Sequence, residues 1–121
     1  MHVHFRDYDM LAKVAVETAN CFAGALVMPN LVQPVTTVEQ CLGYCDRIKA
    51  ITDRCKKFTP YMTLYLQIND FFQDKDKLKA VKLLHGDCIK AFKFYSRGMT
   101  TNSDHGVDLN DLNLLKVLEA M

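Results

Sequence analysis

The chain has 121 residues, of which 50% are hydrophobic and 24% are charged. These values are ordinary for a globular protein, and the length is enough for one domain with its own core. The formal net charge of +1 gives no reason to expect binding to nucleic acid or to an anionic membrane, and no apolar run approaches the ~20 residues that cross a bilayer.

Residues 1–6 are expected to form the first strand. His2, His4 and Arg6 occupy alternate positions, so their side chains should project from one face while Val3 and Phe5 pack on the other. Two imidazoles at this spacing can hold one metal ion, and a guanidinium beside them can hold an anion. The alternative is a frayed terminus with two solvated histidines.

The first helix is expected over residues 10–22, and either Asp7 or Asp9 can provide its N-cap. Gly24 is expected to end this helix. Helical spacing predicts a core-facing side made of Leu11, Val14, Ala15, Ala19 and Phe22.

The second strand is expected over residues 25–28, a continuous apolar run typical of a strand buried on both faces of a parallel sheet. Asn30 then lies at the carboxyl end of this strand. The second helix follows and runs to about residue 52, with Thr36 as N-cap and Glu39 completing a capping box.

The third strand is expected over residues 61–66, since the stretch is rich in β-forming residues and Pro60 is tolerated best near a strand start. The third helix is expected over residues 74–84, with its lysines on a solvated face and Gly86 as C-cap.

The fourth strand is expected over residues 88–95, followed by a polar loop over residues 96–107. This loop is long for a compact α/β unit and suggests a functional role. A last helix over residues 109–120 would be capped by Asp108.

Strands that alternate with helices predict a parallel α/β sheet with right-handed crossovers. Four such units fit either a small, open, doubly wound sheet or half of an eight-unit barrel. No GxGxxG or GxxxxGKS/T sequence occurs, so nucleotide binding has no motif behind it. In parallel α/β folds the functional groups gather at the carboxyl ends of the strands.

Lys93 is unusual because it lies within an aromatic strand sequence, Ala91-Phe92-Lys93-Phe94-Tyr95. A bare ammonium group is costly to bury there. The lysine can point to solvent at a sheet edge, pair with an anion, or lose its charge by a lowered pKa or covalent modification.

The cysteines form an odd, dispersed set of five, Cys21, Cys41, Cys45, Cys55 and Cys88. None of their spacings gives the paired CxxC knuckles of a structural zinc site. We therefore expect reduced cysteines that mostly pack in the core of a cytoplasmic protein. The absence of a basic start leading into an apolar segment predicts that there is no signal peptide.

Four blocks of the sequence resemble dihydroorotase of the single-function bacterial and plant type, in the amidohydrolase superfamily. They are the HxHxRD block at residues 2–7, residues 27–31 with 34–39, residues 58–66, and residues 91–95 with 100–107. HxH alone is shared by the whole superfamily, whereas PNLxxPVTT and TTNSxHGV are more specific. The resemblance implies that residues 1–121 are a single partial domain, the N-terminal four βα units of a TIM (β/α)₈ barrel with outer helices.

The resemblance also implies a metal site. His2 and His4 resemble two ligands of one zinc ion, and Lys93 resembles the lysine that carbon dioxide carbamylates. The resulting N6-carboxylysine bridges two zinc ions in the family, and this change of charge would resolve the unusual position of Lys93.

The substrate-binding residues implied are Arg6 and Asn30, which resemble the groups that hold the substrate carboxylate, and Thr100 and Thr101, which resemble the hydroxyl pair of a closing loop. The reaction implied is the zinc-dependent, reversible cyclisation of N-carbamoyl-L-aspartate to (S)-dihydroorotate in pyrimidine biosynthesis. The resemblance further implies that, in the hydrolytic direction, a zinc-bridging hydroxide attacks the ring amide carbonyl.

The family also needs two further histidine ligands and an aspartate as general acid and base, all from later strands. His85 and His105 do not match these ligands, and a (β/α)₈ barrel usually takes ~250 residues. The sequence is therefore expected to be a truncated or split enzyme, or an expressed part of one, with weak zinc binding and no turnover alone. The complete enzyme is expected to be a homodimer, or to form with a complementary half-barrel chain.

Two alternatives remain at this point. Half a barrel has open strand edges, so the chain can instead be a non-catalytic module that assembles with a partner chain. A small open-sheet protein with an unrelated role would require the matching residues to coincide by chance.

Overall fold

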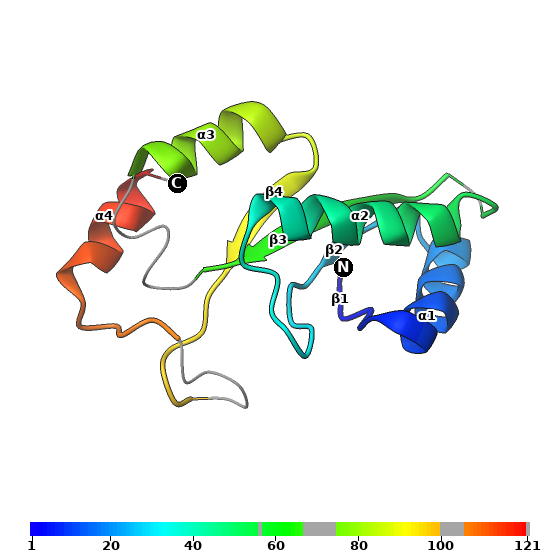
Figure 1. Ribbon diagram of the computed structural model, residues 1–121, viewed down its shortest axis with the longest axis horizontal. Coiled ribbons are helices and arrows are strands. Elements are labelled where there is room, and N and C mark those ends of the chain that lie inside the picture. Colours follow the sequence, from blue (N-terminus) through cyan, green and yellow to red (C-terminus); the bar gives the residue numbers. More distant parts are fainter. Residues whose placement is uncertain (56, 67–74, 100–105, 121) are drawn as a thin grey trace.

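The computed structural model describes residues 1–55, 57–66, 75–99 and 106–120. Strands and helices alternate along them, as predicted (Figure 1). The elements are β1 (His2–Val3), α1 (Tyr8–Cys21), β2 (Gly24–Val27), α2 (Val38–Thr52), β3 (Thr59–Tyr65), α3 (Lys75–His85), β4 (Ile89–Lys93) and α4 (Leu112–Ala120). The described strands form one parallel sheet.

The order of the strands decides between the two predicted architectures. The strands lie in the order β1-β2-β3-β4, which is their order in the chain. A doubly wound sheet reverses its strand order at a switch point, whereas a (β/α)₈ barrel adds each strand beside its predecessor. Because right-handed crossovers without a reversal place successive helices on one face, the described residues form a sector of a barrel-type sheet.

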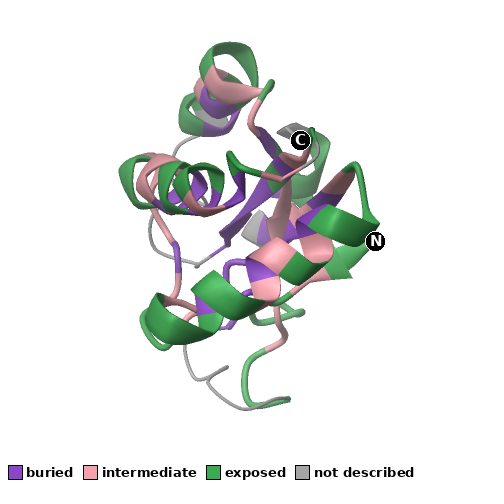
Figure 2. Ribbon diagram, turned by 90° about the vertical axis from the view of Figure 1, so that its right-hand side faces the viewer, coloured by how far each residue is buried: buried purple, intermediate pink, exposed green. Residues whose placement is uncertain are grey.

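The core lies between the sheet and its helices, where the buried residues gather (Figure 2). β3 is deeply buried, since Met62, Thr63, Leu64 and Tyr65 are each at most 2% exposed. Met62 and Leu64 alternate along the strand and belong to one cluster with residues of α1 and α2. Each buried aliphatic side chain contributes about 1.5–3 kcal/mol, and a one-residue slip would turn these side chains to the wrong face.

The first strand is shorter than predicted and ends at Val3 rather than Arg6. Arg6 and Tyr8 have positive φ angles of 65° and 52°, so the chain turns away from the sheet there. Asp7 lies between them and is the N-cap of α1, with its carboxylate accepting a hydrogen bond from the Tyr8 amide at 3.0 Å. A left-handed backbone is costly for residues other than glycine, so neighbouring contacts must hold this turn.

The end of α1 also differs from the prediction. The helix ends at Cys21, and Phe22 is extended and 46% exposed rather than part of the core. Gly24 does not end the helix but opens β2. A Cβ atom on Gly24 would lie 2.9 Å from the Thr59 carbonyl oxygen, so the close approach of β2 and β3 requires glycine here.

The capping box of α2 lies one residue later than predicted. Thr37, not Thr36, is the N-cap, and Gln40, not Glu39, returns a hydrogen bond to the cap backbone. The Thr37 hydroxyl accepts from the Gln40 amide at 3.2 Å, and the Gln40 side-chain oxygen accepts from the Thr37 amide at 3.2 Å.

Helix α4 begins at Leu112, later than predicted. Asp108 closes a turn before the helix instead of capping it, since its carboxylate accepts from the Asn110 amide at 2.9 Å. Among the described residues, no helix is long and apolar enough to cross a membrane.

Candidate active site

His2 and His4 lie side by side at the carboxyl end of β1. Their ring centroids are 5.8 Å apart in an edge-on arrangement, and both side chains are exposed. Phe5, between His4 and Arg6 in sequence, is fully buried. The predicted alternation is therefore present for the two histidines, although the regular strand ends before His4.

Arg6 is placed by contacts from two other segments. Its carbonyl oxygen accepts a hydrogen bond from the Tyr44 hydroxyl at 2.7 Å. Its guanidinium donates from Nη1 to the Asn30 carbonyl oxygen at 3.2 Å. The side chain thus reaches from the end of β1 to the segment after β2, and the backbone is held by α2.

The Asp7 carboxylate strengthens the same turn. Arg47 of α2 donates to its two oxygens, from Nε at 3.2 Å and from Nη2 at 2.9 Å. This paired geometry is more specific than a single ion contact. Together Tyr44 and Arg47 attach the left-handed turn to α2.

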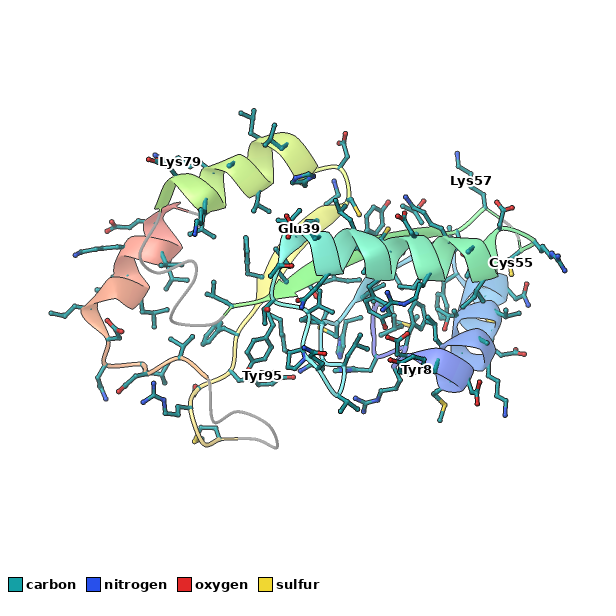
Figure 3. The ribbon with its side chains drawn as sticks, viewed as in Figure 1. Tyr8, Glu39, Cys55, Lys57, Lys79 and Tyr95 are labelled. Atoms are coloured by element: carbon teal, nitrogen blue, oxygen red, sulfur yellow. The ribbon has the colours of Figure 1, made fainter. Side chains whose placement is uncertain are left out.

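Asn30 and two tyrosines form a polar group beyond the ends of β2, β3 and β4. The Asn30 Nδ2 atom donates to the Tyr95 hydroxyl at 2.7 Å, and Tyr95 lies on the segment that leaves β4 (Figure 3). The Tyr95 and Tyr65 ring centroids are 5.8 Å apart. Among the described residues, the buried Asn30 Oδ1 and Tyr65 hydroxyl have no hydrogen-bond partner. Such unpartnered buried atoms are rare and indicate a place for a ligand or water.

Lys93 is the last residue of β4, because the strand ends before Phe94 instead of continuing through it. Its Nζ atom lies 5.0 Å from the centroid of the Tyr95 ring, a cation–π contact. The side chain is partly exposed. Within the described part of the chain, the ion pairs join other residues and none involves Lys93. The ammonium group therefore has an aromatic neighbour but no anionic one there.

The charges of this site come from opposite edges of the sheet. In a flat sheet β1 and β4 would be ~14 Å apart, with two strands between them. The pKa of His4 is nevertheless lowered from its ordinary value by partial burial and then by the positive charges of Arg6, His2 and Lys93. Printed contacts connect the two edges, because Arg6 bonds the Asn30 backbone, the Asn30 side chain bonds Tyr95, and Lys93 lies over the Tyr95 ring. The resulting group of positive charges favours a neutral His4 imidazole and an anionic ligand.

In the described residues, no group of three His, Cys, Asp or Glu side chains is placed to hold a metal ion. Thr100 and Thr101 lie outside the described residues. A cavity of about 510 Å³ lies in the helix layer, between the first turn of α2 and α3, and His85 lines it.

Three tyrosines of the site were not predicted from the sequence. Tyr95 follows Lys93 by two residues, so its place on the same side of an extended segment is readable from the spacing. Tyr65 ends β3 and is the register partner of Lys93. Tyr44 comes from a helix, and only its hydrogen bond to the Arg6 backbone reveals its role.

No protein-family model matches the chain. It is 45% identical over 120 residues to the dihydroorotase of Marinomonas sp. (strain MWYL1), and 44% identical over 120 residues to that of Shewanella frigidimarina (strain NCIMB 400). The chain is homologous to dihydroorotase. Each alignment covers 99% of this chain and 33% of the relative, so the chain spans about a third of the length of these dihydroorotases.

The fold of the chain is also similar to that of solved dihydroorotases. The crystal structure from Campylobacter jejuni matches with a TM-score of 0.83 at 38% identity, covering 100% of this chain and 33% of that one. The structure from Saccharomyces cerevisiae, in complex with 5-fluoroorotic acid, matches with a TM-score of 0.82 at 32% identity, covering 100% and 32%. The four βα units correspond to the N-terminal part of the dihydroorotase (β/α)₈ barrel, which confirms the predicted fold.

Proposed function

We propose that the chain supplies the N-terminal part of a dihydroorotase, a hydrolase that interconverts N-carbamoyl-L-aspartate and (S)-dihydroorotate in pyrimidine biosynthesis. The observation that carries this proposal is the chain of contacts that joins the end of β1 to the end of β4: the adjacent rings of His2 and His4, and the link from Arg6 through Asn30 and Tyr95 to Lys93. The chain that carries them is homologous to dihydroorotase. N-carbamoyl-L-aspartate carries two carboxylates, which a cationic site attracts. The yeast relative was solved with 5-fluoroorotic acid, which is also a carboxylic acid.

We propose that His2 and His4 hold zinc. Their adjacent rings and the lowered pKa of His4 fit this role, because a metal ligand must be a neutral imidazole. Lys93, as the free amine, would bond through Nζ to the carbon of carbon dioxide and release a proton. The product, N6-carboxylysine, offers anionic oxygens that suit two zinc ions. Zinc bound there would supply a Lewis acid for the ring amide carbonyl.

Arg6 and Asn30 are proposed to bind the substrate carboxylate. Arg6 has five N–H donors, and one of them is directed to the Asn30 carbonyl oxygen. A rotation of the Asn30 side-chain amide by a half-turn exchanges the positions of Oδ1 and Nδ2. The Tyr95 hydroxyl would then donate to Oδ1. Nδ2 would take the position where Oδ1 has no hydrogen-bond partner among the described residues. A carboxylate oxygen can accept from that Nδ2. The closing role of Thr100 and Thr101 belongs to the same proposal.

We assign no general acid or base to residues 1–121. The aspartate for that role and two further histidine ligands are proposed to come from the part of dihydroorotase that this chain does not align with, in a longer chain or a complementary half-barrel. The complete enzyme is proposed to be a cytoplasmic homodimer. The free thiols of the five cysteines are in keeping with a reducing compartment.

A second candidate is a non-catalytic half-barrel that assembles with a partner chain. Three leucines along one side of α4 favour association of some kind, since Leu112 is 79%, Leu115 63% and Leu118 49% exposed. Both candidates predict association, and only the second predicts association without catalysis.

The deciding experiment mixes the 121-residue chain with the remaining part of the Marinomonas dihydroorotase and measures hydrolysis of dihydroorotate. We expect no turnover from the chain alone, turnover from the mixture, and in the His4→Ala variant a loss at least as large as the ~10–100-fold that is typical for the partners of a metal ligand. The control recombines the two parts of the Marinomonas enzyme itself. If that control is active while our chain forms a stable but inactive complex, the non-catalytic module is correct. Turnover by the isolated chain would contradict the proposal that the chain needs the remaining part of a dihydroorotase for activity.

A further inference from the structure

Cys45 and Cys88 lie far apart in the sequence but touch through their sulfur atoms. Cys45 is buried on α2, and Cys88 is partly exposed immediately before β4. Their Sγ atoms are 3.4 Å apart in a thiol–thiol hydrogen bond. Cys88 precedes Lys93 by five residues, which is ~16 Å along a strand. The pair is therefore separate from the group of residues at the strand ends.

We propose that Cys45 and Cys88 are a modification site that hydrogen peroxide converts into a disulfide. The Cys88 thiolate attacks one peroxide oxygen and the O–O bond breaks, giving a sulfenic acid and a hydroxide that becomes water with the thiol proton. The Cys45 sulfur then attacks the sulfenic sulfur. The S–S bond forms, the S–O bond breaks, and the hydroxyl leaves as water with the Cys45 proton. Two thiols lose two electrons, and the peroxide becomes two waters.

The surroundings assign different roles to the two thiols. Burial raises the pKa of Cys45 to about 12, helped by the hydrogen bond with Cys88, so Cys45 stays protonated at neutral pH and is a poor direct target. Cys88 is the more exposed of the two and meets the oxidant first. Cys45 then reacts because its sulfur is already in contact. Formation of the disulfide should accordingly be slow at neutral pH and faster in alkaline solution.

Cys41 is the obvious competitor, one helical turn before Cys45. Burial likewise raises its pKa to about 12. Its Sγ atom donates to the Thr63 carbonyl oxygen of β3 at 3.9 Å, whereas the sulfur in contact with Cys88 is that of Cys45. The geometry therefore selects Cys45 as the partner of Cys88.

The disulfide would attach α2 to the start of β4. Because it closes a long loop, it should raise the Tm by roughly 5–15 °C. The strand-end residues are at the other end of β4 and should keep their environment.

The test treats the 121-residue chain with hydrogen peroxide and maps disulfides by mass spectrometry without reductant. The background variant carries Cys21→Ser and Cys55→Ser, which removes thiols that are exposed or partly exposed and prone to link two chains. We expect a Cys45–Cys88 peptide pair, a mass lower by two hydrogen atoms, reversal by dithiothreitol, and the predicted rise in Tm.

The same pair should form in Cys41→Ser and be absent in Cys45→Ala and Cys88→Ala. The disulfide map of the background variant tests the proposal without the alanine variants. The test therefore stays valid even if an alanine variant does not fold. Accumulation of Cys88 sulfinic acid without a disulfide would overturn it. A Cys41–Cys88 disulfide in place of the Cys45–Cys88 disulfide would also overturn the proposal. The same holds if the folded chain gives the same mixture of disulfide pairings as the chain unfolded in urea.

Discussion

Tyr44 and Arg47 show how helix side chains determine the position of a residue in the proposed anion site. The Tyr44 hydroxyl holds the Arg6 carbonyl at 2.7 Å across 38 residues of sequence. Arg47 lies 5.3 Å from the Tyr44 ring centroid and bonds the Asp7 carboxylate. These contacts compensate the positive φ angles on either side of Asp7. The position of Arg6 therefore depends on α2 as much as on its own strand.

Replacing Tyr44 by phenylalanine should lower the free energy of unfolding by about 1 kcal/mol at neutral pH, since one buried hydrogen bond is lost. Burial and the charge of Asp7 raise the pKa of Tyr44 in the folded protein. The unfolded chain therefore loses this proton first, and stability that is present below pH ~10 is lost as the pH rises above it.

Urea unfolding at neutral and alkaline pH tests this prediction. Tyr44→Phe should lose less stability than the wild type on going to alkaline pH. Tyr8→Phe is the matched control, because Tyr8 is 87% exposed and should change neither value. An alkaline loss of equal size in Tyr44→Phe and in the wild type would contradict the assignment.

At the scale of elements, the capping box of α2 gives a direct comparison between neighbouring threonines. Thr37→Ala removes the acceptor for the Gln40 amide and should lower the free energy of unfolding by about 1 kcal/mol. Thr36→Ala should cost only a few tenths of that, since Thr36 is outside the helix and its hydroxyl makes a longer contact to Gln40, at 3.3 Å. Urea unfolding of both variants measures the difference. A larger loss of unfolding free energy in Thr36→Ala than in Thr37→Ala would instead support Thr36 as the N-cap, as expected from the sequence.

The alternation of strands and helices was predictable because apolar spacing is a local property. The exact ends were not. Thr36 and Thr37 are both good caps, and each has a suitable partner three residues later, so only the folded geometry selects Thr37. Likewise the first strand was expected to reach Arg6, but the Tyr44 hydroxyl from a distant helix stabilises a turn there.

The candidate site was predictable where it follows from strand ends and motifs. His2, His4, Arg6, Asn30 and Lys93 were named from the sequence, and the structure brings their segments toward one region. Their roles in binding metal and substrate stay predictions. The contacts that connect them, such as Asn30 with Tyr95, join residues 65 positions apart. No spacing rule contains that information, because it depends on the curvature of the whole sheet.

For the whole molecule, we expect the isolated chain to bind zinc weakly, since its described residues bring together only two imidazoles at the site. His4→Ala should abolish this binding, and His85→Ala, in the helix layer, should leave it unchanged. Bicarbonate should strengthen binding to the wild type but not to Lys93→Gln, because only the lysine can gain a carboxyl group. Competition with a metal-binding dye measures each affinity. If bicarbonate raises the zinc affinity of the wild type and of Lys93→Gln equally, the proposed role of Lys93 is wrong.

The strand order has a consequence for how the chain is made. Each described strand pairs with the strand that was synthesised immediately before it. A ribosome releases the chain from its N-terminus, so β2 can dock on β1, and β3 on β2, while later residues are still inside the exit tunnel. No described strand has to wait for a distant segment before it finds its neighbour. The sheet can therefore grow at one edge, in step with translation.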